Sequence, residues 1–456
     1  MEAFAELVSK INAFVWGPYM LAFLVGTGIY LTLRLGFLQF RTLPYALKLA
    51  FSPKSQDDKS QGDISHFQAL MTALAATIGT GNIAGVATAV FTGGPGAVFW
   101  MWITALFGMA TKYGEGILAV KYRVVDEKGE MAGGPMYYIE RGLKMKWLGW
   151  LFAFFGAIAA FGIGNMVQTN SVAEAVNSTF GVNHLVTGAI LAALTAAVIL
   201  GGIKSIGKVT GFLVPFMALF YVLGGLVIII MNLDKLGPAV SLIFSDAFTG
   251  QAVAGGALGT VIRYGVARGV FSNEAGLGSA PIAAAAAKTD YPGRQALVSM
   301  TGTFLDTIIV CSITGIVLTM AGLYTGDASG ATLTINSFEA FLPGIGKYIV
   351  SIGIIFFAYS TVLGWSYYGE KCFQYIFNRN AVIYYRWAFV IFAFIGCTLK
   401  LTLVWDIADT LNGAMAIPNL IGLVGLSGVI AAETKEFIAV RKCEIEAERS
   451  GKSVGA

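Results

Sequence analysis

Apolar residues along this chain form long runs that short polar or charged segments separate. A helix needs about 20 apolar residues to cross about 30 Å of hydrocarbon, and windows of that kind recur eleven times. The pattern predicts an all-α polytopic membrane protein with eleven transmembrane helices. The windows are Phe14–Leu33, Ala69–Phe91, Ala97–Val120, Leu148–Val172, Leu185–Gly202, Val209–Met231, Gly255–Ala287, Ala296–Leu323, Tyr348–Ile376, Trp387–Leu403 and Leu411–Ala431.

Two of these windows contain a cluster of glycines and polar side chains at mid-membrane depth. Helix 2 contains Thr77-Ile78-Gly79-Thr80-Gly81-Asn82-Ile83-Ala84-Gly85, and helix 7 contains Phe271-Ser272-Asn273-Glu274-Ala275-Gly276-Leu277-Gly278. Such clusters interrupt a helix and leave backbone N–H and C=O groups that lipid cannot satisfy. We therefore expect helices 2 and 7 to be broken and the two breaks to form a solute site.

The two breaks are five helices apart, so helices 2–6 and 7–11 form two repeats and helix 1 is extra. Because five is odd, the repeats run in opposite directions through the membrane. Interrupted helices at matching places in two inverted halves indicate the binding site of a secondary transporter. We expect one transmembrane domain over 1–433, with the extra helix at 14–33, repeat 1 at 66–232, repeat 2 at 254–432 and a cytoplasmic tail at 434–456. The alternative is two unrelated glycine-rich packing helices.

Composition agrees with a membrane protein and argues against several other classes. Charged residues make up 12% of the chain, against about 25% in soluble proteins. Two distant histidines and four cysteines without CxxC spacing do not indicate a metal cluster. No HExxH motif and no GxSxG motif occurs in a membrane context, so we expect no enzyme activity. Lipid, a small solute and a coupling ion are the expected partners, and nucleic acid is not.

The lysines and arginines predict the orientation of the chain in the plasma membrane. Of 30 such residues, 24 fall around the segments that follow odd-numbered helices. Positive charge marks the cytoplasmic side, so the N-terminus should lie outside and the C-terminus inside.

Each broken helix offers two kinds of ligand. Free N–H groups and a positive dipole near Ile83 suit a carboxylate, whereas free carbonyls near Ile78 suit a cation or an ammonium group. A zwitterionic amino acid needs both. Gly79, Gly81 and Gly276 would let the backbone approach the solute closely.

Several charged side chains lie within apolar windows, and four of them are considered for a role in the site or its support. An acid at this depth is costly and should face a cavity, a cation or a donor. Glu274 could contact the solute or ion, or hold the break as a structural lock. For Asp306 we favour pairing with Arg263 or Arg268 over a role as a cation ligand. Lys112 and Glu115, three residues apart, predict a structural ion pair.

Polar side chains on helices 4 and 9 are further candidates. Asn165 and Gln168 could bind the solute or bond between helices. The adjacent hydroxyls of Ser360 and Thr361 could complete an oxygen cage for a hard cation. Trp365 and Phe271 could close the cavity, although buried aromatic residues more often only pack.

Three motifs resemble the alanine or glycine:cation symporter family. They are Gly79-Thr80-Gly81-Asn82-Ile83-Ala84-Gly85-Val86, Gly133-Gly134-Pro135-Met136-Tyr137-Tyr138-Ile139 and Ser272-Asn273-Glu274-Ala275-Gly276-Leu277-Gly278-Ser279-Ala280-Pro281. The resemblance implies the LeuT-type five-plus-five inverted repeat of the amino acid–polyamine–organocation superfamily. It also implies sodium-coupled, or sometimes proton-coupled, uptake of small neutral amino acids.

The resemblance further implies residues for each ligand. Carbonyls of Ala75 and Ile78 with hydroxyls of Ser360 and Thr361 would hold sodium. Asn82 matches a second sodium ligand of some relatives, but Glu274 stands where several relatives have a small neutral residue, so a second sodium site is in doubt. The expected substrate-binding residues are Gly79, Thr80, Gly81, Asn82, Asn165, Gln168, Phe271, Ser272, Asn273 and Gly276.

Other functions remain open from the sequence. An uncoupled or proton-coupled amino acid exchanger would use the same broken helices. A channel is disfavoured because no filter-like repeat occurs.

Overall fold

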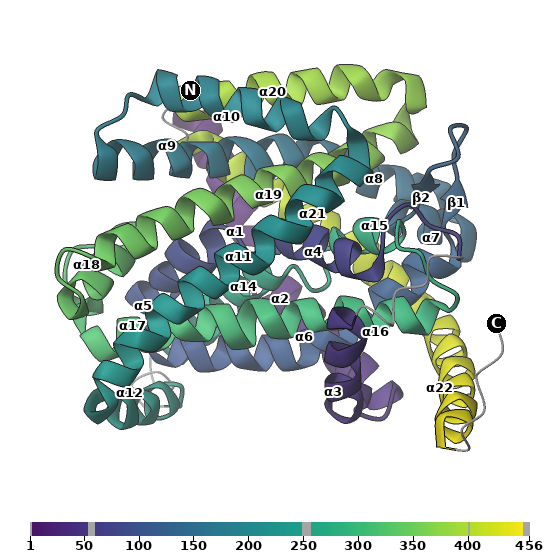
Figure 1. Ribbon diagram of the computed structural model, residues 1–456, viewed down its shortest axis with the longest axis horizontal. Helices are drawn as coiled ribbons and strands as arrows, with labels where there is room; N and C mark the ends of the chain where they lie inside the picture. The colour runs from purple at the N-terminus through teal and green to yellow at the C-terminus, as the bar shows by residue number, and fades with distance from the viewer. Residues whose placement is uncertain (1, 53–59, 249–256, 400–401, 450–456) are drawn as a thin grey trace.

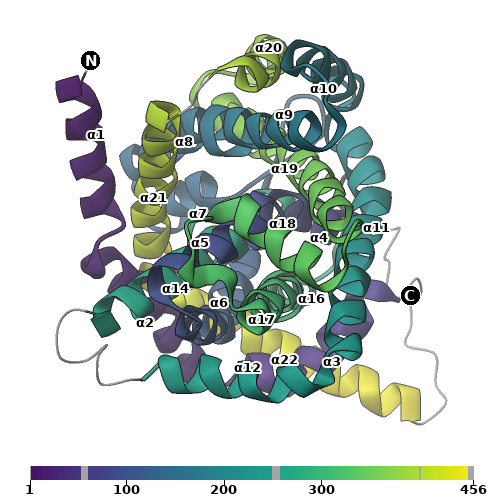
Figure 2. The same cartoon turned by 90° about the vertical axis from the view of Figure 1, so that its left-hand side faces the viewer.

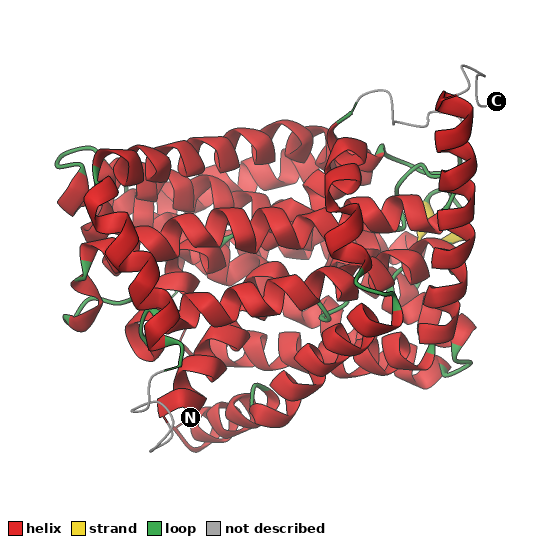
Figure 3. Cartoon of the chain, turned by 90° about the horizontal axis from the view of Figure 1, so that it is seen from below, coloured by secondary structure: helices red, strands yellow, loops and turns green. Residues whose placement is uncertain are grey.

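The computed structural model describes residues 2–52, 60–248, 257–399 and 402–449. Within these ranges almost every segment is helical, and the strands form one short hairpin (Figure 3). In the hairpin, β1 (Val124–Val125) pairs antiparallel with β2 (Met131–Ala132). The predicted all-α class is confirmed.

The helices follow the predicted windows in order. Those of the first half are α1 (Glu2–Val15), α2 (Pro18–Arg34), α3 (Leu38–Phe51), α4 (His66–Thr77), η2 (Gly81–Gly85), α5 (Val86–Gly93), α6 (Gly96–Lys121), α7 (Pro135–Gly142), α8 (Lys146–Phe161), η3 (Gly162–Met166), α9 (Val167–Phe180), α10 (His184–Ile199), α11 (Gly202–Met231) and α12 (Leu233–Asp246). Those of the second half are α14 (Ala257–Asn273), α15 (Ala280–Ala284), α16 (Pro292–Thr303), η4 (Phe304–Cys311), α17 (Ser312–Ala321), η5 (Leu323–Thr325), α18 (Gly330–Phe341), α19 (Gly346–Ile376), η6 (Arg379–Ala381), α20 (Val382–Thr398), α21 (Thr402–Gly425) and α22 (Ser427–Arg449).

Several helices are long and apolar enough to cross a bilayer. Among the described residues, seven meet that criterion alone, and an eighth span results if α4 and the helix after it are taken together. The helix α10 is apolar but shorter. The count of eleven crossings stays a prediction, and the expected repeat boundary at residue 254 lies outside the described residues.

The connecting elements of the two halves lie at opposite ends of the molecule. After α6 the chain forms the β1–β2 hairpin and α7, and after α17 it forms η5 and α18. The hairpin and α7 lie at the right of Figure 1 and α18 lies at the left, with α6, α16 and α19 running between them. We call these the hairpin end and the α18 end. Equivalent connections at opposite ends are what an inverted repeat requires.

The extra N-terminal helix is divided in two. A helix was expected at 14–33, and the structure has α2 at Pro18–Arg34 with the separate α1 before it. The division falls at Gly17, whose backbone is extended, and Pro18 begins α2, where its missing N–H costs nothing. Figure 2 shows α1 running beside α21.

The first break is narrow. Helix α4 begins with a capping box between Ser65 and Gln68, which satisfies the first free N–H groups. It ends at Thr77, and the π-helical turn η2 begins three residues later, after Thr80. The two helical pieces differ in direction by 52°.

The second break is wide. Helix α14 continues through Asn273, so Phe271 and Ser272 are still helical although the interruption was expected to include them. The irregular backbone follows, with positive φ at Glu274 (55°), Gly276 (92°) and Gly278 (84°). Glycine adopts this region freely, whereas Glu274 does so at a cost. The break ends at α15, which carries Pro281 in its first turn.

Candidate functional site

The two breaks lie against each other in the centre of the helix bundle. A Cβ added at Gly81 would stand 3.2 Å from the ring of Phe271 and 3.6 Å from the Cα of Ser272. Glycine at position 81 therefore permits the close contact between the two interrupted helices. Of the predicted break residues, Ala84, Gly85 and Phe271 are partly exposed and the others are buried.

Four oxygens converge beside the first break, as expected for the predicted sodium site. The hydroxyls of Ser360 and Thr361 on α19 lie 3.3 and 3.1 Å from the carbonyl oxygen of Ala75. They lie 3.4 and 3.5 Å from that of Ile78. Oxygens that bind a cation of this size at about 2.3–2.6 Å stand about 3.3–3.7 Å apart along the edges of an octahedron. The donor set and its spacing thus fit Na⁺.

A buried aspartate connects the two breaks on a second side. Asp306, in the π-helical segment η4, accepts hydrogen bonds from Asn82 Nδ2 (2.6 Å) and Ser272 Oγ (2.9 Å). Thr307 donates to it at 2.7 Å. The favoured pairing with Arg263 or Arg268 is wrong, because neither arginine forms an ion pair with Asp306 within 4.0 Å among the described residues. Three donors stabilise the carboxylate instead.

The second break is held by Glu115 of α6, which the sequence analysis assigned to another role. Its Oε1 accepts hydrogen bonds from the backbone N–H groups of Gly276 (3.1 Å) and Gly278 (3.2 Å) and from Asn419 Nδ2 (2.7 Å). Asn419 also donates to the carbonyl of Gly276 at 2.9 Å. The expected ion pair with Lys112 is wrong, since the structure brings no oxygen of Glu115 within ion-pair distance of that lysine.

Glu274 is likewise engaged within the protein. Its carboxylate accepts a hydrogen bond from Trp365 Nε1 at 2.9 Å and one from Ser279 Oγ at 2.5 Å. Glycine at 164 lets Trp365 approach, because a Cβ there would overlap the Trp365 side chain. These contacts match the structural-lock hypothesis for Glu274.

The two candidate residues of helix 4, Gln168 and Asn165, contact different parts of the structure. Gln168 reaches the first break, where its Oε1 accepts from the Thr80 N–H at 3.4 Å. Asn165 donates to the carbonyl of Phe389 on α20 at 2.7 Å and so bonds between helices. The hydroxyl oxygen of Thr80 is buried and has no protein partner. A pocket of about 410 Å³ extends from Thr80 between α9, α18 and α19.

Gly276 lies away from the first break. Its surroundings are Leu24, Leu420 and Thr111, and its N–H and carbonyl are taken by Glu115 and Asn419. Asn273 donates to Thr307 Oγ1 at 3.1 Å and accepts from the Ala275 N–H at 3.0 Å. Of the residues predicted for the second break, Phe271 and Ser272, at the end of α14, are therefore the ones that face the first break.

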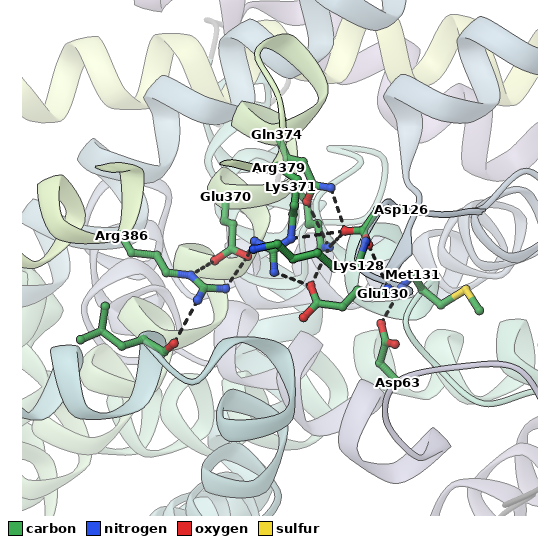
Figure 4. Close-up of polar contacts among 11 residues, drawn as sticks. Asp63, Asp126, Lys128, Glu130, Met131, Glu370, Lys371, Gln374, Arg379 and Arg386 are labelled. Carbon is green, nitrogen blue, oxygen red and sulfur yellow. Dashed lines mark hydrogen bonds and ion pairs between the residues drawn. The ribbon is translucent and has the colours of Figure 1, made fainter. Parts of the chain in front are cut away.

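An ionic network closes the hairpin end (Figure 4). Arg379 contacts Asp126 at 3.4 Å and Glu130 at 2.7 Å, which joins the loop of the hairpin to the corner between α19 and α20. Glu370 forms a bidentate pair with Arg386 at 2.7 and 2.8 Å. Asp63 accepts from the Met131 N–H, and burial raises the pKa of this aspartate.

The sequence gives only weak evidence for the roles of Glu115 and Asn419 at the second break. Glu115 is an acid within an apolar window, but its partners are backbone groups more than 150 positions away. Asn419 is an isolated amide, and Tyr138 donates to its side-chain oxygen. For both Glu115 and Asn419, the only signal in the sequence is a polar side chain within an apolar window.

Comparison with known proteins adds the family. A model of the sodium:alanine symporter family matches residues 1–450. The chain belongs to the sodium:alanine symporter family. The sodium/alanine symporter AgcS of Methanococcus maripaludis is 69% identical over 449 residues, which cover 97% of this chain and 99% of that protein. The probable sodium/glutamine symporter GlnT of Bacillus subtilis is 38% identical, covering 96% and 91%.

A solved structure agrees with the fold. The crystal structure of MhsT in complex with L-phenylalanine superposes with a TM-score of 0.61, covering 82% of this chain and 93% of that one. At 13% identity the likeness shows the fold alone, which is the predicted LeuT type. The resemblance to the alanine or glycine:cation symporters is confirmed, and this member of the family is a multi-pass membrane transporter and not an enzyme.

Proposed function

We propose that this protein carries alanine, glycine or a similar small neutral amino acid into the cell together with Na⁺. The observation that carries the proposal is the convergence of the two broken helices, with four oxygens set around one point beside the first break. The names of the similar symporters support alanine as the substrate.

The proposed roles follow from the geometry. Ala75, Ile78, Ser360 and Thr361 bind Na⁺. The amino acid lies between Gly79–Asn82 and Phe271–Ser272, where Thr80 has a free hydroxyl and Gln168 faces the same backbone. Asp306 accepts hydrogen bonds from both Asn82 and Ser272 and so fixes their relative position. Glu115 and Glu274 keep the second break open, and Asn165 positions helix 4.

The proposed cycle is alternating access. In this proposal the hairpin end faces the cytoplasm, in agreement with the lysine and arginine distribution, with the N-terminus outside and the C-terminus inside. The ionic network around Arg379 closes that end while the amino acid enters from the α18 end. The repeats at 66–232 and 254–432 then move against each other.

The membrane potential and the Na⁺ gradient together provide enough free energy to concentrate the amino acid inside the cell. One charge crossing about 100 mV contributes about 2.3 kcal/mol, and a tenfold Na⁺ gradient adds about 1.4 kcal/mol. Together they support an alanine gradient of several hundred-fold.

Uptake into proteoliposomes tests the proposal. Labelled alanine should accumulate when an inward Na⁺ gradient is imposed, and a K⁺ gradient should give only the background. Accumulation driven by a proton gradient alone, or by preloaded alanine without Na⁺, would instead indicate the exchanger. Competition by glycine and by glutamine would separate an alanine-type from a glutamine-type substrate range.

A further inference from the structure

A groove with apolar walls lies between the helices α2, α6 and α14. Its volume is about 610 Å³, within the range of about 300–1,000 Å³ that ligand pockets occupy. Ala22 and Arg263 line it and are exposed, so the groove opens to the surface of the bundle. We call it the α2–α14 groove. The apolar residues of its wall are Leu21, Ala22, Val25, Ile103, Ile262 and Val266.

The groove is formed by the beginnings of its three helices. Each of its residues lies within about the first ten of its helix, because α2 begins at Pro18, α6 at Gly96 and α14 at Ala257. Ten residues of helix span about 15 Å, which is half of the hydrocarbon thickness. Trp100 and Tyr264 also line the groove, and such aromatic residues are common at the membrane interface. In the orientation proposed above, the groove therefore lies in the outer half of the bilayer.

Arg263 places a positive charge in this apolar groove. Among the described residues, none forms a hydrogen bond with Arg263 or an ion pair within 4.0 Å. Arg294, at the start of α16, differs because it pairs with both Asp290 and Glu444. A charged side chain at membrane depth is costly without a partner. The α2–α14 groove thus combines an apolar wall with a cation that the protein does not neutralise.

These two features match the two parts of a phospholipid. A guanidinium binds phosphate oxygens through two parallel N–H···O bonds, and an apolar wall gains free energy by covering a hydrocarbon chain with matching shape. A second copy of the chain could also cover the apolar wall. The wall alone would not distinguish these two occupants, but the charge of Arg263 favours the one that brings an anion.

We propose that the α2–α14 groove binds one anionic phospholipid of the outer leaflet. Its phosphate contacts the Arg263 guanidinium, and one of its chains lies along Ala22, Val25 and Ile103. A headgroup with net negative charge, as in phosphatidylglycerol, complements Arg263 better than phosphatidylcholine does, because choline brings a second cation to the same place. This inference goes beyond the proposed function, since it does not depend on which solute is carried.

The test measures lipid binding to the full-length purified protein in detergent. Phosphatidylglycerol or phosphatidylcholine is added in increments, and native mass spectrometry gives the number of bound lipids and the Kd of the first one. Arg263→Gln removes the charge. Arg268→Gln is its matched control, because Arg268 lies five residues later on α14 and does not line the groove.

A second pair of variants tests the apolar wall with the charge intact. Ala22→Trp fills the groove. Gly26→Trp is its control, because Gly26 lies one turn later on α2, does not line the groove, and has no atom within 4 Å of an added Cβ.

The wild type should bind one phosphatidylglycerol about tenfold more tightly than phosphatidylcholine. For Arg263→Gln we expect the phosphatidylglycerol Kd to rise about tenfold, to the value for phosphatidylcholine, because the charge-assisted contact is lost. Ala22→Trp should weaken the binding of both lipids about tenfold. Arg268→Gln and Gly26→Trp should match the wild type.

Three results would overturn the inference. The first is an equal Kd of the wild type for the two lipids. The second is an Arg263→Gln variant that binds phosphatidylglycerol as tightly as Arg268→Gln does. The third is a dimer of the wild type that Ala22→Trp dissociates and Gly26→Trp does not, which would assign the groove to a second copy of the chain. Alanine uptake enters none of these measurements, so the proposed function and this inference fail or stand separately.

Discussion

Both helix breaks expose backbone groups that have no partner within a helix, but the side chains that contact these groups differ between the two breaks. At the first break, glycine and hydroxyl groups approach the open backbone, and the carbonyls of Ala75 and Ile78 lie beside the hydroxyls of Ser360 and Thr361. At the second break, the carboxylates of Glu115 and Glu274 accept hydrogen bonds from the surrounding N–H, O–H and indole donors.

The difference assigns separate tasks to the two breaks. Hydroxyls are weak partners that can turn from a carbonyl to an ion, so the first break keeps its ligand capacity for Na⁺. Charge-assisted bonds are roughly twice as strong as neutral ones, so the second break is fixed and presents Phe271 and Ser272 from a rigid support. The following substitutions test that division.

Removal of the Glu115 carboxylate should have the largest effect. Glu115→Ala leaves the backbone N–H groups of Gly276 and Gly278 without their acceptor, and at about 1–3 kcal/mol for each unsatisfied buried donor we expect a loss of about 2–6 kcal/mol in stability. Thermal unfolding in detergent measures it. Glu115→Gln keeps one acceptor oxygen and should lose much less; equal unfolding temperatures for Glu115→Ala and the wild type would show that the second break does not depend on this residue.

Removal of the Ser360 and Thr361 hydroxyls from the proposed Na⁺ site should have the second-largest effect. The double variant Ser360→Ala, Thr361→Ala removes two ligands, each worth about 1.5 kcal/mol, so the Na⁺ concentration for half-maximal uptake should rise about 100-fold. Ser366→Ala on the same helix is the control, because its hydroxyl bonds only the carbonyl of Leu363. An unchanged Na⁺ dependence in the double variant would place the ion elsewhere.

Gly79→Ala should have an intermediate effect. The added Cβ would stand 2.5 Å from Thr361 Oγ1, and overpacking of this kind costs about 1–3 kcal/mol, so uptake should fall about tenfold or more. Gly85→Ala is matched to it, because no atom lies within 4 Å of the added Cβ. If both variants transport equally, the close approach at position 79 has no functional role.

Glu274→Gln should have the smallest effect. The amide can keep one acceptor for Trp365 and donate to Ser279, so we expect a loss of about 1 kcal/mol in stability. Alanine affinity and Na⁺ dependence should not change. A shift in either, measured by binding titrations, would move Glu274 from the structural role to direct contact with the ion or the solute.

The sequence alone determined that the chain is a bundle of membrane helices with two interruptions. Long apolar runs predict helices because only internally bonded backbone is stable in lipid, and glycine clusters inside those runs mark the breaks. Ala75, Ile78, Ser360 and Thr361 were grouped through family resemblance, and the structure brings them together.

Only the tertiary structure decided which partner each buried polar residue has. Glu115 and Lys112 are neighbours on one helix, so the sequence predicts a local ion pair. In the structure the Glu115 carboxylate instead accepts hydrogen bonds from the backbone N–H groups of Gly276 and Gly278. Asp306 is held by Asn82 and Ser272, while the Arg268 guanidinium lies over the Phe271 ring. Such contacts join residues far apart in the chain, and the hydrophobic pattern that predicts each helix carries no information about which faces of two helices meet.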